Sequence, residues 1–127
     1  MASPTRFPIR FGMFRHGLIA LGAGPKRSGV WIDGERMRVR LGPAFTANVA
    51  LASVKKVGPD HQMVTGIGAH GWRGNWLVNG AASDIVRVEL DPAGQARVLG
   101  FPVKLRVLRV SMESPEAFMA ALADARR

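Results

Sequence analysis

The chain has 127 residues, the length of a single domain, and its 47% of apolar residues exclude a disordered chain. No apolar run approaches the roughly 18 residues of a membrane helix or resembles a secretory signal, and the absence of cysteine excludes disulfides and thiolate metal sites. A net charge of +9 attracts polyanions such as nucleic acid, an acidic membrane surface or acidic proteins, but the charges are scattered along the chain, never more than two adjacent, which favours an ordinary solvated surface. The cytoplasm is the expected location.

The N-terminal part is expected to add strands to the main body of a single domain that covers residues 1–127. Residues 1–5 predict a loose tail, and residues 6–28 predict extra strands. In residues 6–13, apolar side chains alternate with arginine, proline and glycine, as in a half-buried strand. The apolar residues are Phe7, Ile9, Phe11 and Met13. Pro8 cannot donate a hydrogen bond to a neighbouring strand, so we expect an edge position. Residues 18–21 form a second, short apolar element before a glycine-rich loop.

Residues 33–48 carry the clearest strand pattern of the chain. Two sets of side chains alternate strictly: Arg36, Arg38 and Arg40 on one side, and Met37, Val39 and Leu41 on the other. Successive side chains of a strand point to opposite faces, so one face is buried and the other carries three cations. A register slip of one residue would bury the arginines, which fixes the register. Asp33-Gly34 predicts a tight hairpin turn from a strand at residues 30–32.

Further strands are expected along the rest of the chain. They cover residues 45–51, 53–57, 76–78, 85–90 and 103–111. Turns are expected at residues 58–60 (GPD) and 91–94 (DPAG), and the glycine-rich residues 65–74 are expected to be irregular. In the last strand the apolar parity slips between Val107 and Leu108, which predicts a bulge or burial of both faces.

One helix is predicted at the C-terminal end. Ser114 has the features of an N-cap, Pro115 suits the first helical position, and Glu116 places an acid in the first turn. An apolar stripe follows, formed by Phe118, Met119, Leu122 and Ala125. Together these patterns predict a mainly β protein: strongly bent antiparallel sheets that form a partly open barrel, capped by one C-terminal α-helix.

From about Gly29 onward, the order of these elements resembles the small bacterial pleckstrin-homology-like (PH-like) domains of uncharacterised function. The resemblance rests on residues 30–43 (VWIDGERMRVRLGP), 76–80 (WLVNG) and the helix start at 114–118 (SPEAF). It implies a seven-stranded, two-sheet barrel with a C-terminal helix over residues 29–127, to which residues 6–28 are an addition. It also implies a non-enzymatic binding or scaffolding module without a cofactor, with a protein partner or self-association. The acidic, tight hairpin at Asp33-Gly34 argues against phosphoinositide binding.

The glycine-rich segment is one candidate for a binding site. Residues 66–71 match G-x-G-x-x-G, but the motif requires a helix at its end, and the turn and strand expected after Gly71 exclude a dinucleotide site. A bendable loop could still present His70, Trp72 and Arg73 to an anion, with backbone N–H groups, a stacking face and a guanidinium. The alternative is a barrel corner with Trp72 packed inward.

The second candidate is the arginine ladder at Arg36, Arg38 and Arg40. Its cations lie about 7 Å apart along a strand, close to the spacing of phosphates. Arg106 and Arg109 are candidates to extend it, and a solvated face with Glu35 or Glu89 paired across strands is the alternative. Basic strands with exposed aromatic residues are typical of single-stranded nucleic-acid binding. The few aromatic residues, however, fall mostly at core positions.

Neither catalysis nor metal binding has a convincing pattern. The three histidines, at positions 16, 61 and 70, have no metal-ligand spacing, and no serine lies in a nucleophile elbow. Two hypotheses follow: a PH-like module that binds a protein or itself through an edge strand, and a basic β-barrel that binds nucleic acid or another polyanion. A third, an enzyme or carrier, would require a wide cavity inside the barrel.

Overall fold

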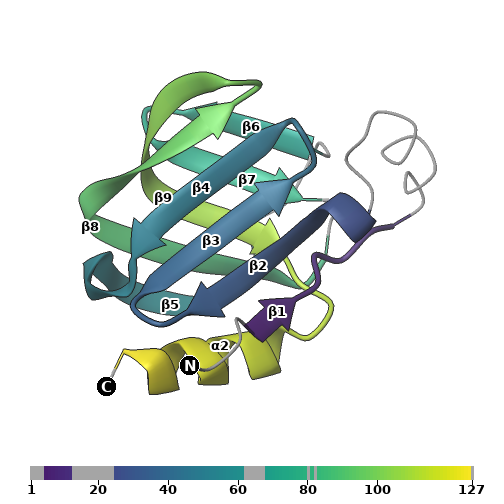
Figure 1. Ribbon diagram of the computed structural model, residues 1–127. Helices are drawn as coiled ribbons and strands as arrows, with labels where there is room; N and C mark the ends of the chain where they lie inside the picture. Colours follow the sequence, from purple (N-terminus) through teal and green to yellow (C-terminus); the bar gives the residue numbers. More distant parts are fainter. Residues whose placement is uncertain (1–4, 13–24, 62–67, 80, 82, 127) are drawn as a thin grey trace.

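The computed structural model describes residues 5–12, 25–61, 68–79, 81 and 83–126. The elements are β1 (Thr5–Phe7), η1 (Pro25–Arg27), β2 (Ser28–Asp33), β3 (Arg36–Leu41), β4 (Phe45–Ala50), η2 (Leu51–Ser53), β5 (Val54–Asp60), β6 (Gly68–Trp72), β7 (Asn75–Asn79), β8 (Ile85–Val98), β9 (Phe101–Ser111) and α2 (Pro115–Ala125). The protein is mainly β, and the sheet curls into an open half-barrel with the helix across one end, as predicted (Figure 1).

The described strands form one continuous sheet of nine strands, in the order β1-β2-β3-β4-β8-β9-β7-β6, with β5 paired to β8. The resemblance implied seven strands in two sheets, so this count differs. The pairs are antiparallel except β7 and β9, which are parallel. The described part of the sheet does not close, because its order ends at β1 on one side and β6 on the other.

The alternation predicted for residues 36–41 is confirmed. Met37, Val39 and Leu41 are buried, at most 2% exposed, while the three arginines between them are exposed. β3 lies between β2 and β4, so its buried side chains face neighbours such as Val30 and Val49 in the common core. The turn at its start lies one residue later than expected, because Asp33 pairs with Arg36 and leaves Gly34-Glu35 as the two turn residues.

The turn predicted at residues 91–94 is wrong. β8 continues through it to Val98, and its register with β9 shifts between Glu89 and Gly94. The extra residues bend β8, so that its first half pairs with β5 and its second half with β4. The extra residues lie in β8, opposite Val107, and in β9 Leu105 and Leu108, which have opposite parity, are both fully buried, as the second of the two predicted alternatives required. The true turn is Leu99-Gly100, where both residues have positive φ (49° and 85°), as in a type I′ hairpin.

Two further sequence predictions are wrong. β5 does not end at residues 58–60 but runs to Asp60; it bonds to β8 among the described strands, and a proline is tolerated in such an edge strand. Residues 68–72 form β6, not irregular chain, and the turn to β7 is Arg73-Gly74. Gly71 is opposite Trp76, whose ring occupies the space where a Cβ would lie, so this glycine serves packing within a strand.

The N-terminal segment agrees with the sequence in part. β1 begins at Thr5, inside the tail expected at residues 1–5, and ends at Phe7 instead of continuing as a long strand. Among the described strands β1 lies at an edge of the sheet, as Pro8 indicated, and Ile9 is buried and bridges to Met112. Met13 and the apolar element at residues 18–21 lie outside the described residues.

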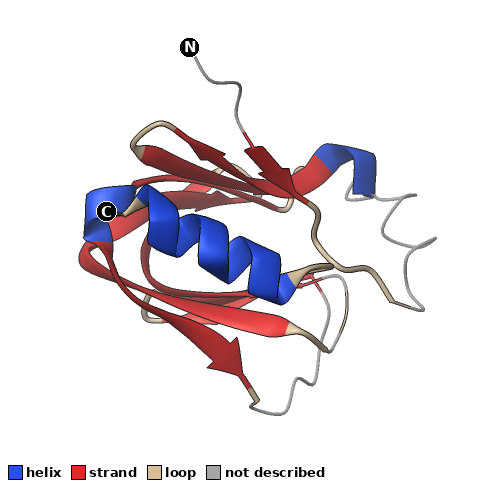
Figure 2. Ribbon diagram, turned by 90° about the horizontal axis from the view of Figure 1, so that it is seen from below, coloured by secondary structure: helices blue, strands red, loops and turns tan. Residues whose placement is uncertain are grey.

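The helix α2 covers one end of the core (Figure 2). Phe118 and Leu122 are fully buried, and Met119 and Ala125 pack against the core as predicted. Ser114 occupies the N-cap position and Pro115 the start of the helix, but the Ser114 side chain makes no capping hydrogen bond. The ring of Phe118 meets that of Phe7 edge to face, with 5.5 Å between centroids.

Candidate functional site

The outward sides of β1 to β4 join those of the second half of β8 and the first half of β9 in one surface. Cross-strand partners point to the same side of a sheet. One row of partners joins Arg6, Trp31, Arg38 and Asn48, and the next joins Arg40, Thr46, Arg97 and Pro102. We call this surface the basic face; it comprises Arg6, Trp31, Arg36, Arg38, Arg40, Thr46, Asn48, Gln95, Arg97, Pro102 and Lys104.

Few acids accompany these cations. Residues 36–59 and 92–107, which supply most of the basic face, contain no aspartate or glutamate. Asp33, at the end of β2, lies 3.9 Å from the guanidinium of Arg38, and both side chains are about half exposed. Glu89, a candidate partner from the sequence, is instead 3.5 Å from Arg87 on its own strand. The six cations of the basic face outnumber Asp33, the acid paired with them, so the basic face keeps a positive field.

Trp31 brings an aromatic side chain to the basic face. Its ring has the guanidinium carbons of Arg6 and Arg38 at 5.8 and 5.7 Å from the centroid, a cation–π arrangement on neighbouring strands. The residue is half-buried rather than enclosed in the core, whereas the sequence suggested that aromatic residues fall mostly at core positions. The basic face therefore combines cations with one accessible aromatic group.

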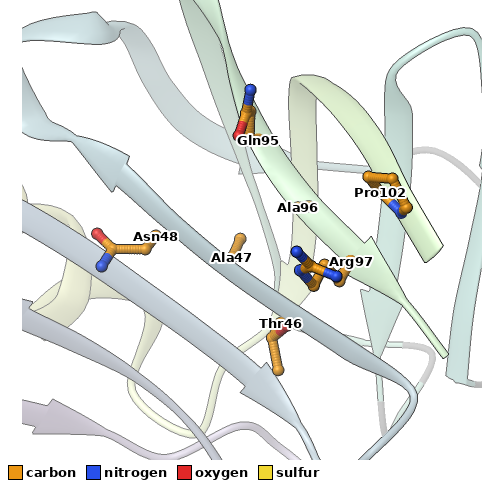
Figure 3. A pocket seen from close by; sticks show the side chains of 7 residues that line it. All are labelled: Thr46, Ala47, Asn48, Gln95, Ala96, Arg97 and Pro102. Carbon is orange, nitrogen blue, oxygen red and sulfur yellow. The ribbon is translucent and has the colours of Figure 1, made fainter. Parts of the chain in front are cut away.

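A hollow of about 290 Å³ lies in the basic face between β4 and β8 (Figure 3). It forms because the two strands pair only over Phe45–Ala47 and Ala96–Val98 and then diverge. Ala47 and Ala96, which are 8% and 4% exposed and have their side chains in the core, form its base. Polar side chains and one proline complete its lining: Thr46, Asn48, Gln95, Arg97 and Pro102.

One lining side chain is held in a defined orientation. The Nε of Arg36 donates to Oδ1 of Asn48 at 2.8 Å, and Nη2 of Arg36 donates to the Asn48 carbonyl at 3.0 Å. A guanidinium only donates, so the atom of Asn48 that meets it must be the amide oxygen. The amide NH₂ group is then the part of Asn48 that can donate to a ligand.

The residues predicted from the glycine-rich segment do not form the expected loop. His70 and Trp72 belong to β6, and their side chains lie outside the described part of the structure. Arg73 is exposed in the β6–β7 turn with φ of 51°. The carbonyl of Gly74 accepts from the amides of Arg106 and Val107 at 2.7 and 3.0 Å, which ties this turn to β9.

The arginine ladder, in contrast, lies where the sequence placed it. Arg36, Arg38 and Arg40 occupy the outward side of β3, and Arg106 is exposed on β9. Arg109 does not extend the ladder, because its Nε pairs with Asp60, whose side chain is 4% exposed. No pattern in the sequence singled out Thr46, Asn48, Gln95 and Arg97. The alternation of β4 could have indicated that Thr46 and Asn48 point outward, but not that they lie next to residues of β8.

The described residues contain no group of three or more histidines or acids able to hold a metal ion. Within the same part of the chain, no helix is both long and apolar enough to cross a membrane. No family model, curated protein or solved structure matches the chain. The functional assignment therefore depends on the basic face itself.

Proposed function

We propose that the protein is a non-enzymatic, PH-like binding module that holds a polyanion on its basic face. The curled half-barrel with a C-terminal helix is compatible with the PH-like fold. One observation carries the functional part: cations from β1, β3, β8 and β9 share one surface, and the strand stretches that supply most of it contain no acids.

The spacing of these cations suits a chain of phosphates. Cations along β3 repeat about every 7 Å, and neighbouring strands add a step of about 4.8 Å across the sheet. Most of the cations are arginines, whose planar fork matches a phosphate through two hydrogen bonds. Each phosphate neutralised by a basic side chain releases counterions, so binding of this kind must weaken as salt rises.

A salt series with a pure phosphodiester probe tests the proposal. The probe is a fluorescein-labelled abasic oligodeoxynucleotide of about 12 units, and its anisotropy gives Kd between about 50 and 200 mM salt. The variant Arg38→Gln/Arg40→Gln removes two cations of the basic face. The control Lys55→Gln/Lys56→Gln removes the same charge from the exposed part of β5.

The wild type is expected to bind the probe with a steep dependence on salt. The arginine variant should bind more weakly and lose about one unit of the log–log slope for each phosphate contact removed, while the lysine control changes little. Equal effects of the two variants would show that net charge alone drives binding. That result, or a wild type that does not bind at the lowest salt, would refute a role for the basic face.

A protein partner at the edge of the sheet is the second candidate. The strand order ends at β6, which bonds to β7 among the described strands, and an unpaired strand edge can accept another strand. Such pairing uses backbone hydrogen bonds and should barely respond to salt. Sedimentation equilibrium at low and high salt would detect a salt-insensitive dimer, and a monomer at all concentrations would exclude self-association of this kind.

A further inference from the structure

We infer that the hollow between β4 and β8 receives an unstacked nucleobase, so that the polyanion is a single-stranded nucleic acid. The inference rests on the proposed function, because the arginines of the basic face would hold the phosphates on either side of that base. Beyond the proposed function, it names the class of polyanion, a single-stranded nucleic acid, and the hollow as the site for one of its bases.

The chemistry of the hollow matches that of a base. A nucleobase has apolar faces and an edge of hydrogen-bond donors and acceptors. The hollow offers apolar surface from Pro102, its base is formed at the nearly buried Ala47 and Ala96, and its polar rim can both donate and accept. Its volume of about 290 Å³ is at the lower end of the range for small-ligand sites, about 300 to 1,000 Å³. Such a space suits one ring system rather than a large ligand.

The polar rim favours bases rich in acceptors. Arg36 fixes the oxygen of Asn48, which leaves the Asn48 NH₂ group to donate. Arg97 can only donate, and it holds Gly100 O with Nη1 at 3.1 Å while its other nitrogens remain to meet a ligand. Thymine, uracil and guanine present carbonyl acceptors at positions where adenine and cytosine present amino groups. We therefore expect the first three to bind more tightly.

Cations flank the hollow on both sides. Arg40 pairs across the sheet with Thr46 on one side, and Lys104 pairs with Gln95 on the other. Neighbouring strands are about 4.8 Å apart, so these cations lie roughly one strand beyond each wall of the hollow. A strand of nucleic acid crossing the basic face can place a base in the hollow and its neighbouring phosphates on Arg40 and Lys104.

A double helix fits this surface less well. Bases in a duplex are stacked and expose only their edges in the grooves, where an inserted helix or a β-ribbon reads them. The α2 helix covers one end of the core, away from the second half of β8 (Figure 1). It also carries two exposed acids, Glu116 and Asp124, which phosphates repel. The hollow lies between strands and can admit a base only after that base has left its stack.

Two probes of equal charge test the inference. Anisotropy is measured with fluorescein-labelled (dT) and abasic oligodeoxynucleotides, both of about 12 units. The variants Asn48→Ala and Thr46→Met respectively remove a donor from the hollow and fill it, without changing charge. Asn75→Ala, at another exposed strand asparagine outside the hollow, is the matched control. All three positions are exposed, and thermal melting verifies that each variant folds.

The wild type should bind the (dT) probe about tenfold more tightly than the abasic probe. Asn48→Ala should reduce that ratio about fivefold, and Thr46→Met should abolish it. The ratio of the two affinities is the readout for both variants, because Asn48→Ala also releases the guanidinium of Arg36, which changes the binding of both probes together. Asn75→Ala should behave as the wild type.

Each alternative result has one meaning. Equal affinity of the wild type for the two probes would overturn the inference and leave the polyanion proposal standing. A ratio that survives both Asn48→Ala and Thr46→Met would also overturn it, since the base would then be bound elsewhere. Failure of the wild type to bind either probe at low salt would refute the proposed function together with the inference.

Discussion

Replacing Phe118 by alanine should cost a large part of the stability of the protein. The side chain is fully buried, and it joins α2 to the N-terminal strand through its edge-to-face contact with Phe7 at 5.5 Å. Removing a buried phenylalanine ring costs about 3 to 5 kcal/mol, because burial is lost and a cavity remains. Single domains have free energies of unfolding of about 5 to 15 kcal/mol, so Phe118→Ala would leave a marginally stable protein.

Urea unfolding followed by tryptophan fluorescence measures this loss. Phe101→Ala is the matched control, because that ring is 74% exposed and its removal should change the free energy of unfolding by less than about 0.5 kcal/mol. A double-mutant cycle with Phe7→Ala should give a coupling energy of about 0.5 to 1.5 kcal/mol for the aromatic pair. A loss below about 1 kcal/mol for Phe118→Ala would refute the packing of α2 against the core.

Two other substitutions test contacts that only the folded chain brings together. Asp60→Asn leaves the guanidinium of Arg109, 13% exposed, without its charged partner, and urea unfolding should show a loss of about 3 to 5 kcal/mol. A loss no larger than that of an exposed aspartate would contradict the pair. Gly71→Ala would force a methyl group into the ring of Trp76, which should lower stability by about 1 to 3 kcal/mol and alter the tryptophan fluorescence. An unchanged melting temperature would contradict that packing.

Much of the architecture follows from local patterns in the sequence. The strict alternation of residues 36–41 fixes which side of β3 is buried, because a strand has a period of two and arginine does not enter a core without a partner. Pro115 and Glu116 similarly mark the start of the only α-helix that the described residues form. The ladder of three arginines was therefore identified before the fold was known.

The patterns that failed are those with more than one local meaning. Proline and glycine at residues 58–60 and 91–94 are typical of turns, but an edge strand tolerates the first set and a bulge in a bent strand contains the second. Conversely, Leu99 has a side chain untypical of a turn, yet it takes positive φ in the β8–β9 hairpin. In each case the neighbouring strands decide whether the segment forms a turn or continues a strand.

The sequence by itself determined the class of fold, the buried side of β3, the helix and the three arginines of the ladder. Each of these depends on a pattern of side chains that are close together in the chain. Tertiary structure alone decided that Thr46 pairs with Arg97 and that β4 and β8 diverge beyond the next pair, Ala47 and Ala96, to leave the hollow. Pairing between segments so far apart depends on the burial of the whole core and on the bend in β8. No short stretch of residues encodes either one.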